Sequence, residues 1–212
     1  DVALTPNIVA HIDGSYRKSD DLRVGGFVLS PSLRAEQLEI AAEEAEEGHA
    51  EEAAEATALA NLRGRIPNSA TETYTIGGGL SLITDGGSLG FSASYFDTDY
   101  GVPSRPGAGH HHGEEGEEEE GEEEEEAAVT IGLQQFRADL RGEVIVGGSF
   151  LDRVRVRAGY ADYKHTEFEG AEVGTMFRSD AFEGRVELVQ TDREGWRGVT
   201  GLQGFTRNFS AI

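Results

Sequence analysis

Histidine and glutamate gather in one stretch of this 212-residue chain, and both side chains can bind metal cations. Three consecutive histidines stand directly before a run of glutamates, and the residues at this junction are His110, His111, His112, Glu114 and Glu115. Neutral imidazole and carboxylate oxygen are suitable ligands for Zn²⁺, and imidazole also suits Cu²⁺ and Ni²⁺. We therefore predict that this segment captures a cation transiently and passes it on.

Two other places in the sequence repeat this chemistry. His49 lies within a second glutamate-rich stretch, and His165 is separated by one residue from Glu167 at the end of a predicted strand. Residues two apart on a strand share a face, so this pair is the more rigidly held candidate. His11 falls in the middle of a predicted strand, and we interpret it as structural or as lining an interior. The competing interpretation of the His-Glu segment is a solvated surface loop without a specific ligand.

Other kinds of chemistry find little support in the sequence. The formal net charge is −22, from 40 acidic and 18 basic residues, which argues against a nucleic-acid partner and favours cations. There is no cysteine, so neither a disulfide nor a thiolate metal site can form. No nucleophile elbow or phosphate-binding loop is present, and we predict that the protein is not an enzyme.

The elements that must hold these residues show a period of two. In the segment from Arg153 to Tyr160, valine and alanine occupy one face while arginine occupies the other. Segments 137–144 and 183–188 alternate in the same way, with both signs of charge on the polar face, so cross-strand ion pairs are expected. In a soluble sandwich the apolar face would pack on a second sheet, whereas in an outer-membrane barrel it faces lipid and the polar face lines the lumen.

Strand length and loop length favour the barrel. The predicted strands are roughly 8–18, 70–84, 88–99, 129–145, 151–167, 174–190 and 196–210. Most exceed the roughly 5–6 residues of an ordinary soluble strand. Tight turns alternate with long loops at about 19–69 and 100–128, and aromatic residues cluster near the strand ends, as in outer-membrane proteins. The predicted fold class is all-β, an antiparallel up-and-down transmembrane β-barrel of which this chain supplies about seven strands.

The long loops have their own composition. Residues 32–62 are rich in alanine, glutamate and leucine, which predicts a helical insertion capped by Ser32 and interrupted near Gly48. The segment 113–128 carries dense negative charge and nothing apolar to bury, which predicts a mobile, solvated loop. No run of 18 apolar residues and no signal peptide is present, and seven strands do not match an even-numbered bacterial barrel. We therefore expect residues 1–212 to be a partial barrel without a plug domain.

Several short stretches resemble TonB-dependent outer-membrane receptors, particularly the branch linked to zinc uptake. The most specific is Tyr95 to Pro103, because in such receptors a similar Tyr-Gly-Ile/Val-Pro segment precedes a loop rich in histidine and acidic residues. Further matching stretches are 13–24, 65–69, 159–167, 170–177 and 195–203. The resemblance covers most of the chain outside the two acidic segments, and about the first third of a typical receptor barrel.

The resemblance implies a function and a set of partners. It implies a protein of the bacterial outer membrane that contacts lipid, imports zinc as cargo rather than as a prosthetic group, and meets the TonB energy-transducing complex through the missing plug region. Three alternatives stay open: a passive outer-membrane porin, a siderophore or haem receptor, and a soluble acidic β-protein that binds Ca²⁺ or a partner. No Asp-x-Asp-x-Asp-Gly loop supports a dedicated calcium protein.

Overall fold

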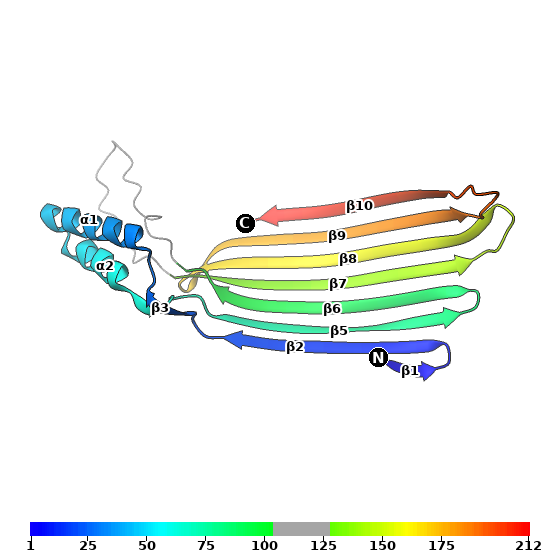
Figure 1. Cartoon of the computed structure of the whole chain (residues 1–212), viewed down its shortest axis with the longest axis horizontal. Helices are drawn as coiled ribbons and strands as arrows, with labels where there is room; N and C mark the ends of the chain where they lie inside the picture. The colour runs from blue at the N-terminus through cyan, green and yellow to red at the C-terminus, as the bar shows by residue number, and fades with distance from the viewer. Residues whose placement is uncertain (104–127) are drawn as a thin grey trace.

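A single antiparallel sheet dominates the computed structural model, which describes residues 1–103 and 128–212 (Figure 1). Eight strands follow one another across it in chain order. They are β1 (Val2–Thr5), β2 (Ile8–Ser19), β5 (Thr71–Thr84), β6 (Gly87–Gly101), β7 (Val129–Ile145), β8 (Leu151–Glu169), β9 (Glu172–Gln190) and β10 (Val199–Ala211). This up-and-down order confirms the prediction of an antiparallel all-β fold. Within the described residues the sheet stays open, with β1 at one edge and β10 at the other.

The seven predicted strands are all present, and their ends agree to within about three residues. Strand β1 was not predicted; it pairs with the start of β2 through a tight turn at Pro6. Its four residues are too few to establish an alternation. Pairing between β8 and β9 is irregular between Leu151 and Arg153 and between Glu167 and Phe168, whereas β7 and β8 stay in register from Val129 opposite Glu169 to Ile145 opposite Arg153.

The helical insertion and the turns after β1, β5, β7 and β9 lie at opposite ends of the sheet, and the short β8–β9 turn at Gly170 lies at the same end as the insertion, as predicted (Figure 1). Figure 1 shows the β1–β2, β5–β6, β7–β8 and β9–β10 turns at one end, and the helical insertion at the other. Gly87 begins β6 with φ 143°, and a side chain at this position would collide with the backbone carbonyl of Glu143 on β7. Glycine therefore allows the β5–β6 turn to pass close against the neighbouring strand.

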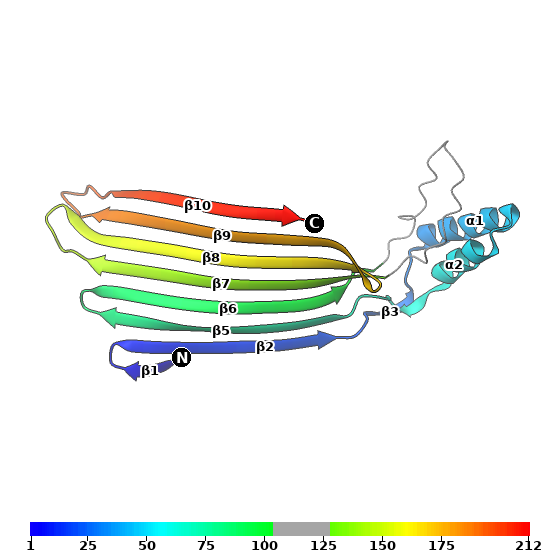
Figure 2. The same cartoon turned by 180° about the vertical axis from the view of Figure 1, so that it is seen from behind.

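The insertion between β2 and β5 is a helical hairpin carried on a two-stranded ribbon (Figure 2). Its elements are β3 (Arg23–Phe27), α1 (Pro31–Glu47), α2 (Ala50–Asn61) and β4 (Arg63–Arg65). The predicted helix and its interruption near Gly48 are confirmed, but the predicted cap at Ser32 is wrong. Ser30 caps α1 by accepting a hydrogen bond from the Leu33 backbone N–H at 3.3 Å, because Pro31 occupies the first helical position, where its missing N–H is not needed.

The hairpin has a small core of its own. Ala41, Ala56 and Ala60 are the only buried apolar residues in the described parts of the chain, and all three lie on the two helices. At the base of the hairpin, the guanidinium groups of Arg34 and Arg63 lie 3.2 Å and 3.6 Å from the centre of the Phe27 ring. These contacts join α1 to the ribbon. Neither helix combines the length and the apolar character that a membrane-crossing helix requires.

The sheet, by contrast, is a single layer with two different faces. The strand register places Val154, Val156 and Ala158 on one side with the apolar residues of the other strands, and we call this side the apolar face. Arg153, Arg155 and Arg157 lie on the opposite side, which we call the charged face. No described residue of the sheet is a buried apolar side chain, so the sheet has no hydrophobic core of its own.

Candidate metal-binding residues and the two faces of the sheet

His49 is drawn back onto the end of α1, beside two glutamates. Gly48 adopts φ 96°, which reverses the chain so that the His49 N–H donates to the Glu44 carbonyl at 2.9 Å. The His49 Nδ1 atom then lies 2.8 Å from Glu44 Oε2 and 3.8 Å from Glu47 Oε2. One ligand atom from each of the three residues fits within 4.8 Å of the others. One imidazole and two carboxylates form a donor set suitable for Zn²⁺.

The carboxylates around His49 also change its titration. A hydrogen bond with Glu44 is the main reason that the pKa of His49 is raised, and the negative charges of Glu52, Glu44 and Glu47 act in the same direction, against a smaller effect of burial. The imidazole therefore keeps its proton to a higher pH than usual. A metal ion would have to displace this proton, so binding at this cluster should strengthen as the pH rises.

His165 and Glu167 lie on the charged face, near the loop end of β8. His165 Nε2 is 3.5 Å from Glu167 Oε1, and His165 Nδ1 lies 3.0 Å from the Tyr163 hydroxyl. The imidazole also packs edge-on against Phe177 of β9, with 5.4 Å between the ring centres. Nε2 is buried and has no hydrogen-bond partner among the described residues. The predicted pairing of these two residues is present, but the imidazole is enclosed by its neighbours rather than open to an ion.

The other predicted ligands fall in different parts of the molecule. His110, His111, His112, Glu114 and Glu115 lie outside the described residues. His11 lies on the charged face, where its two ring nitrogens are each 2.8 Å from a carboxylate oxygen, one of Asp1 and one of Asp13. This placement agrees with a structural interpretation of His11. The structure thus keeps the His49 and His165 groups separate, on the hairpin and on β8.

Sequence reasoning missed Glu44 as the main partner of His49. The two residues are five apart, which would place them on different faces if the helix continued. Gly48 ends the helix in a left-handed conformation, and this reversal brings the imidazole back to Glu44. A glycine between a glutamate-rich helix and a histidine was the available signal, since glycine is the usual residue at such a helix end.

Ion pairs bridge the strands on the charged face, as the alternation predicted. Glu143 on β7 accepts hydrogen bonds from Arg155 at 2.8 Å and from Arg153 at 3.1 Å, both on β8. Arg137 pairs with Asp139 along β7 at 2.7 Å. All of these side chains are at least partly exposed, so each pair adds little stability by itself. Together they form a charged surface that extends over β7, β8 and β9.

The apolar face ends at a row of aromatic rings. Six neighbouring strands each place one ring on this face at a similar height, and the residues are Tyr16, Tyr74, Tyr95, Phe136, Tyr160 and Phe182. Neighbouring rings make contact, with 4.8 Å between the centres of Tyr16 and Tyr74 and 6.5 Å between Phe136 and Tyr160. We call this set the aromatic row. Toward the loops, the next residues on the same face are polar or charged, for example Lys18, Glu72 and Asp97.

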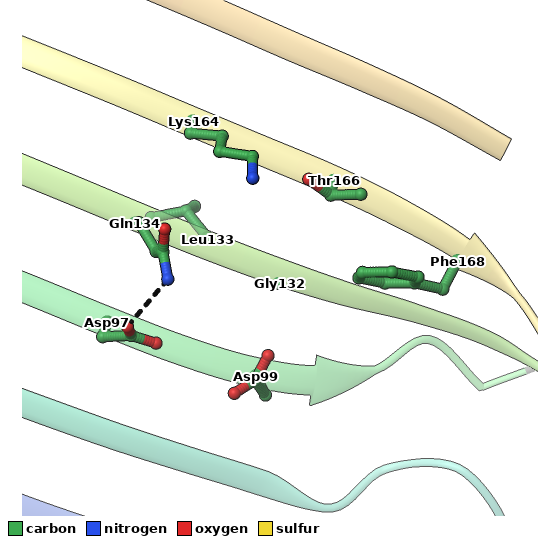
Figure 3. A pocket seen from close by; sticks show the side chains of 8 residues that line it. All are labelled: Asp97, Asp99, Gly132, Leu133, Gln134, Lys164, Thr166 and Phe168. Atoms are coloured by element: carbon green, nitrogen blue, oxygen red, sulfur yellow. Dashed lines mark hydrogen bonds between the residues drawn. The ribbon is translucent and has the colours of Figure 1, made fainter. Parts of the chain in front are cut away.

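A shallow hollow opens immediately beyond the aromatic row (Figure 3). It has a volume of about 250 Å³ and is lined by residues of β6, β7 and β8. Asp97 accepts a hydrogen bond from the Gln134 amide at 3.1 Å, while Asp99 and Lys164 lie on opposite sides (Figure 3). Gly132 has no side chain, so nothing fills the bottom of the hollow at this position. The hollow therefore mixes both signs of charge and does not resemble a cage of carboxylates around a metal ion.

No protein-family model and no curated protein matches this chain.

Proposed function

We propose that this chain forms part of the β-barrel of a TonB-dependent outer-membrane receptor, which captures a metal cation, with zinc as the favoured cargo. The observation that carries the proposal is the apolar face, which no protein layer covers in the described structure. Leu80 is 53% exposed, Phe91 is 52% exposed and Leu202 is 81% exposed. Soluble monomers rarely expose continuous apolar surfaces of this kind, and in this proposal the hydrocarbon of the outer membrane covers the face.

The height and borders of the apolar face suit a bilayer. On β7 the face runs from Phe136 at the aromatic row to Val144 near the short turn, about 27 Å along the strand at about 3.4 Å per residue. With the strand tilt of about 35–45° typical of outer-membrane barrels, this length projects to about 19–22 Å along the membrane normal, slightly less than their apolar band of about 25 Å. Aromatic residues at one border with charged residues beyond them also match the interface of such a band.

The two free edges of the sheet define what the proposal requires. In hydrocarbon, unpaired backbone N–H and C=O groups cost free energy, so a transmembrane β-sheet must close into a barrel. The proposal therefore requires further strands to pair with β1 and β10, in addition to the plug region through which the TonB complex would act. In this arrangement the charged face lines the water-filled interior and the hairpin projects from the loop end of the barrel.

The described cluster of possible metal ligands also lies at the loop end of the sheet (Figure 1). The Glu44–Glu47–His49 cluster lies on the hairpin, and the predicted ligands His110, His111 and His112 belong to the loop between β6 and β7. Both are connected to the same end of the sheet, so an ion captured by one could be passed toward the interior. Zinc is favoured because imidazole with carboxylate oxygen is a common donor set for it.

The absence of cysteine allows a direct test of the membrane assignment. Val156→Cys and Arg157→Cys place single thiols on neighbouring residues of β8, one on each face. Each full-length variant would carry an environment-sensitive fluorophore and be reconstituted into vesicles containing brominated lipid. Strong quenching at position 156 with weak quenching at position 157 is the expected result. Equal quenching at both positions, or none at either, would refute the membrane assignment.

A zinc titration tests the metal assignment separately. The wild type would be compared with His49→Ala and with a variant in which alanine replaces His110, His111 and His112. A matched control is His11→Ala, which removes an imidazole outside both predicted sites. We expect at least a tenfold loss of zinc affinity in one of the first two variants, but not in the control. Unchanged affinity in both would remove metal capture from the proposal while leaving the membrane test intact.

A further inference from the structure

Three arginines stand side by side across the charged face. The register pairs Arg141 of β7 directly with Arg157 of β8, and Arg157 directly with Arg185 of β9. Like charges placed directly opposite each other on neighbouring strands destabilise a sheet. This arginine row is therefore unfavourable unless negative charge compensates it, and in a chain of net charge −22 it forms a local positive centre.

The nearest acidic side chains already have other partners. Glu143 binds Arg153 and Arg155, Asp139 binds Arg137, and Glu187 binds Arg185. Glu183 accepts a hydrogen bond from the Gln203 amide at 2.7 Å. Within residues 1–103 and 128–212, Arg141 and Arg157 make no ion pair and no side-chain hydrogen bond. Two adjacent guanidinium groups in the row are thus left with their donors free.

A hollow lies beside these two free groups. The next residue on the charged face of β8 is Gly159, which has no side chain, and the charged residues around it enclose about 210 Å³. The polar lining residues are Arg137, Asp139, Arg141, Arg157, Glu183, Arg185 and Gln203. In the register, Asp139 and Glu183 lie on either side of Gly159, one row toward the loops from the arginines, so an anion would be held at the arginine side of the hollow.

We propose that Arg141 and Arg157 form a binding site for a small oxyanion, a carboxylate or a phosphate. Guanidinium presents a planar fork of N–H donors that matches both oxyanions in a bidentate manner. The Cα atoms of directly opposed residues on neighbouring strands lie about 5 Å apart, so guanidinium groups extending from both can reach one bound anion. The anion supplies the missing negative charge and relieves the repulsion within the row. This site uses only the charged face, so it does not depend on lipid covering the other face.

The test measures binding of inorganic phosphate and of citrate to the full-length chain in neutral detergent at low salt, by isothermal titration calorimetry. Arg141→Gln and Arg157→Gln each remove one guanidinium group, and each is expected to weaken binding of the anion at least tenfold. Arg157→Lys keeps the positive charge but loses the planar, bidentate donor geometry of guanidinium, so we expect a loss of affinity between that of the wild type and that of Arg157→Gln. Arg17→Gln is the matched control, since it removes the same charge from the same face on β2, several strands away.

The two ligands also identify the source of the oxyanion. Saturable binding of only one of them, lost in Arg141→Gln and Arg157→Gln, supports the site and assigns its ligand class. Absence of saturable binding of both ligands to the wild type would overturn the proposal. An equal loss in Arg17→Gln would overturn it as well, because it would show diffuse attraction rather than a site. Far-ultraviolet circular dichroism of each variant shows whether the sheet is retained. If a glutamine variant does not fold, the affinity of Arg157→Lys decides the question instead.

Discussion

The helical hairpin and the sheet satisfy the hydrophobic requirement in opposite ways. The hairpin turns alanines of α1 and α2 toward each other, and Ala60 is completely buried. The sheet exposes nearly every large apolar side chain that it carries on its apolar face. The hairpin can therefore be stabilised by contacts within the chain, whereas the sheet must obtain its apolar contacts from something else. This contrast separates a self-contained insertion from a surface that depends on its surroundings.

The largest effect is expected from a charge placed on the apolar face. Val156→Arg should destabilise folding into vesicles by about 2–4 kcal/mol, the usual loss for arginine at the middle of a bilayer. Urea titration of the vesicle-inserted protein measures this change. The control is Ser92→Arg on the charged face, where the new side chain lies opposite Asp139 and should have little effect. Equal losses in the two variants would remove the distinction between the faces.

The next effect concerns the hairpin core. Ala60→Leu adds volume at a position with 0% exposure and should cost about 1–3 kcal/mol of local stability. Hydrogen exchange should show faster exchange of the α1 and α2 amides, with the amides of β7 to β9 unchanged. Ala58→Leu, at an exposed position of α2, is the matched control. If exchange in the strands accelerated equally, hairpin and sheet would form one cooperative unit and the contrast would be lost.

A smaller change is expected at the junction between the helices. Gly48→Ala forces a side chain into the left-handed conformation and should destabilise the hairpin by about 1–2 kcal/mol. Because the same reversal brings His49 to Glu44, zinc affinity should fall together with helix content. Gly48→Asn should be better tolerated, since asparagine adopts this conformation more readily. Zinc affinity that survived Gly48→Ala would place the ion elsewhere.

The smallest effect is the pH dependence of His49. Its pKa is raised in the folded protein, so its contribution to stability is fully present below the ordinary pKa of histidine and is lost as the pH rises through the raised value. Nuclear magnetic resonance of the imidazole follows this titration. Glu44→Gln should bring the pKa back toward its usual value, whereas Glu39→Gln, farther along α1, should not. An unchanged titration in Glu44→Gln would contradict the hydrogen bond as the main cause.

The alternation of apolar and polar residues predicted the strands of the sheet well, because each strand has one apolar and one polar face and its sequence therefore alternates with a period of two. The segment around Val154 and Arg155 shows this clearly, and β8 has nearly the predicted bounds. The ribbon strands β3 and β4 were not predicted. They have five and three residues, rich in glycine and arginine, and such short segments show no alternation of apolar and polar residues.

The arginine row shows the limit of sequence reasoning. Alternation assigned Arg141, Arg157 and Arg185 to polar faces of three strands, but their direct opposition depends on the register. Register follows from the geometry of each turn and from pairing along the whole strand, since a shift of one residue moves a side chain to the other face. The contact between His49 and Glu44 had the same difficulty, because it depends on where α1 ends.

The β8–β9 hairpin continues well past Tyr160 before it turns at Gly170, a distance of about 30 Å at about 3.4 Å per residue. If the aromatic row marks the membrane border, this tip stands far enough outside to be reached by large molecules. An antibody raised against residues 169–172 would then label intact cells, while the short turns at the other end would be accessible only after the cells are opened.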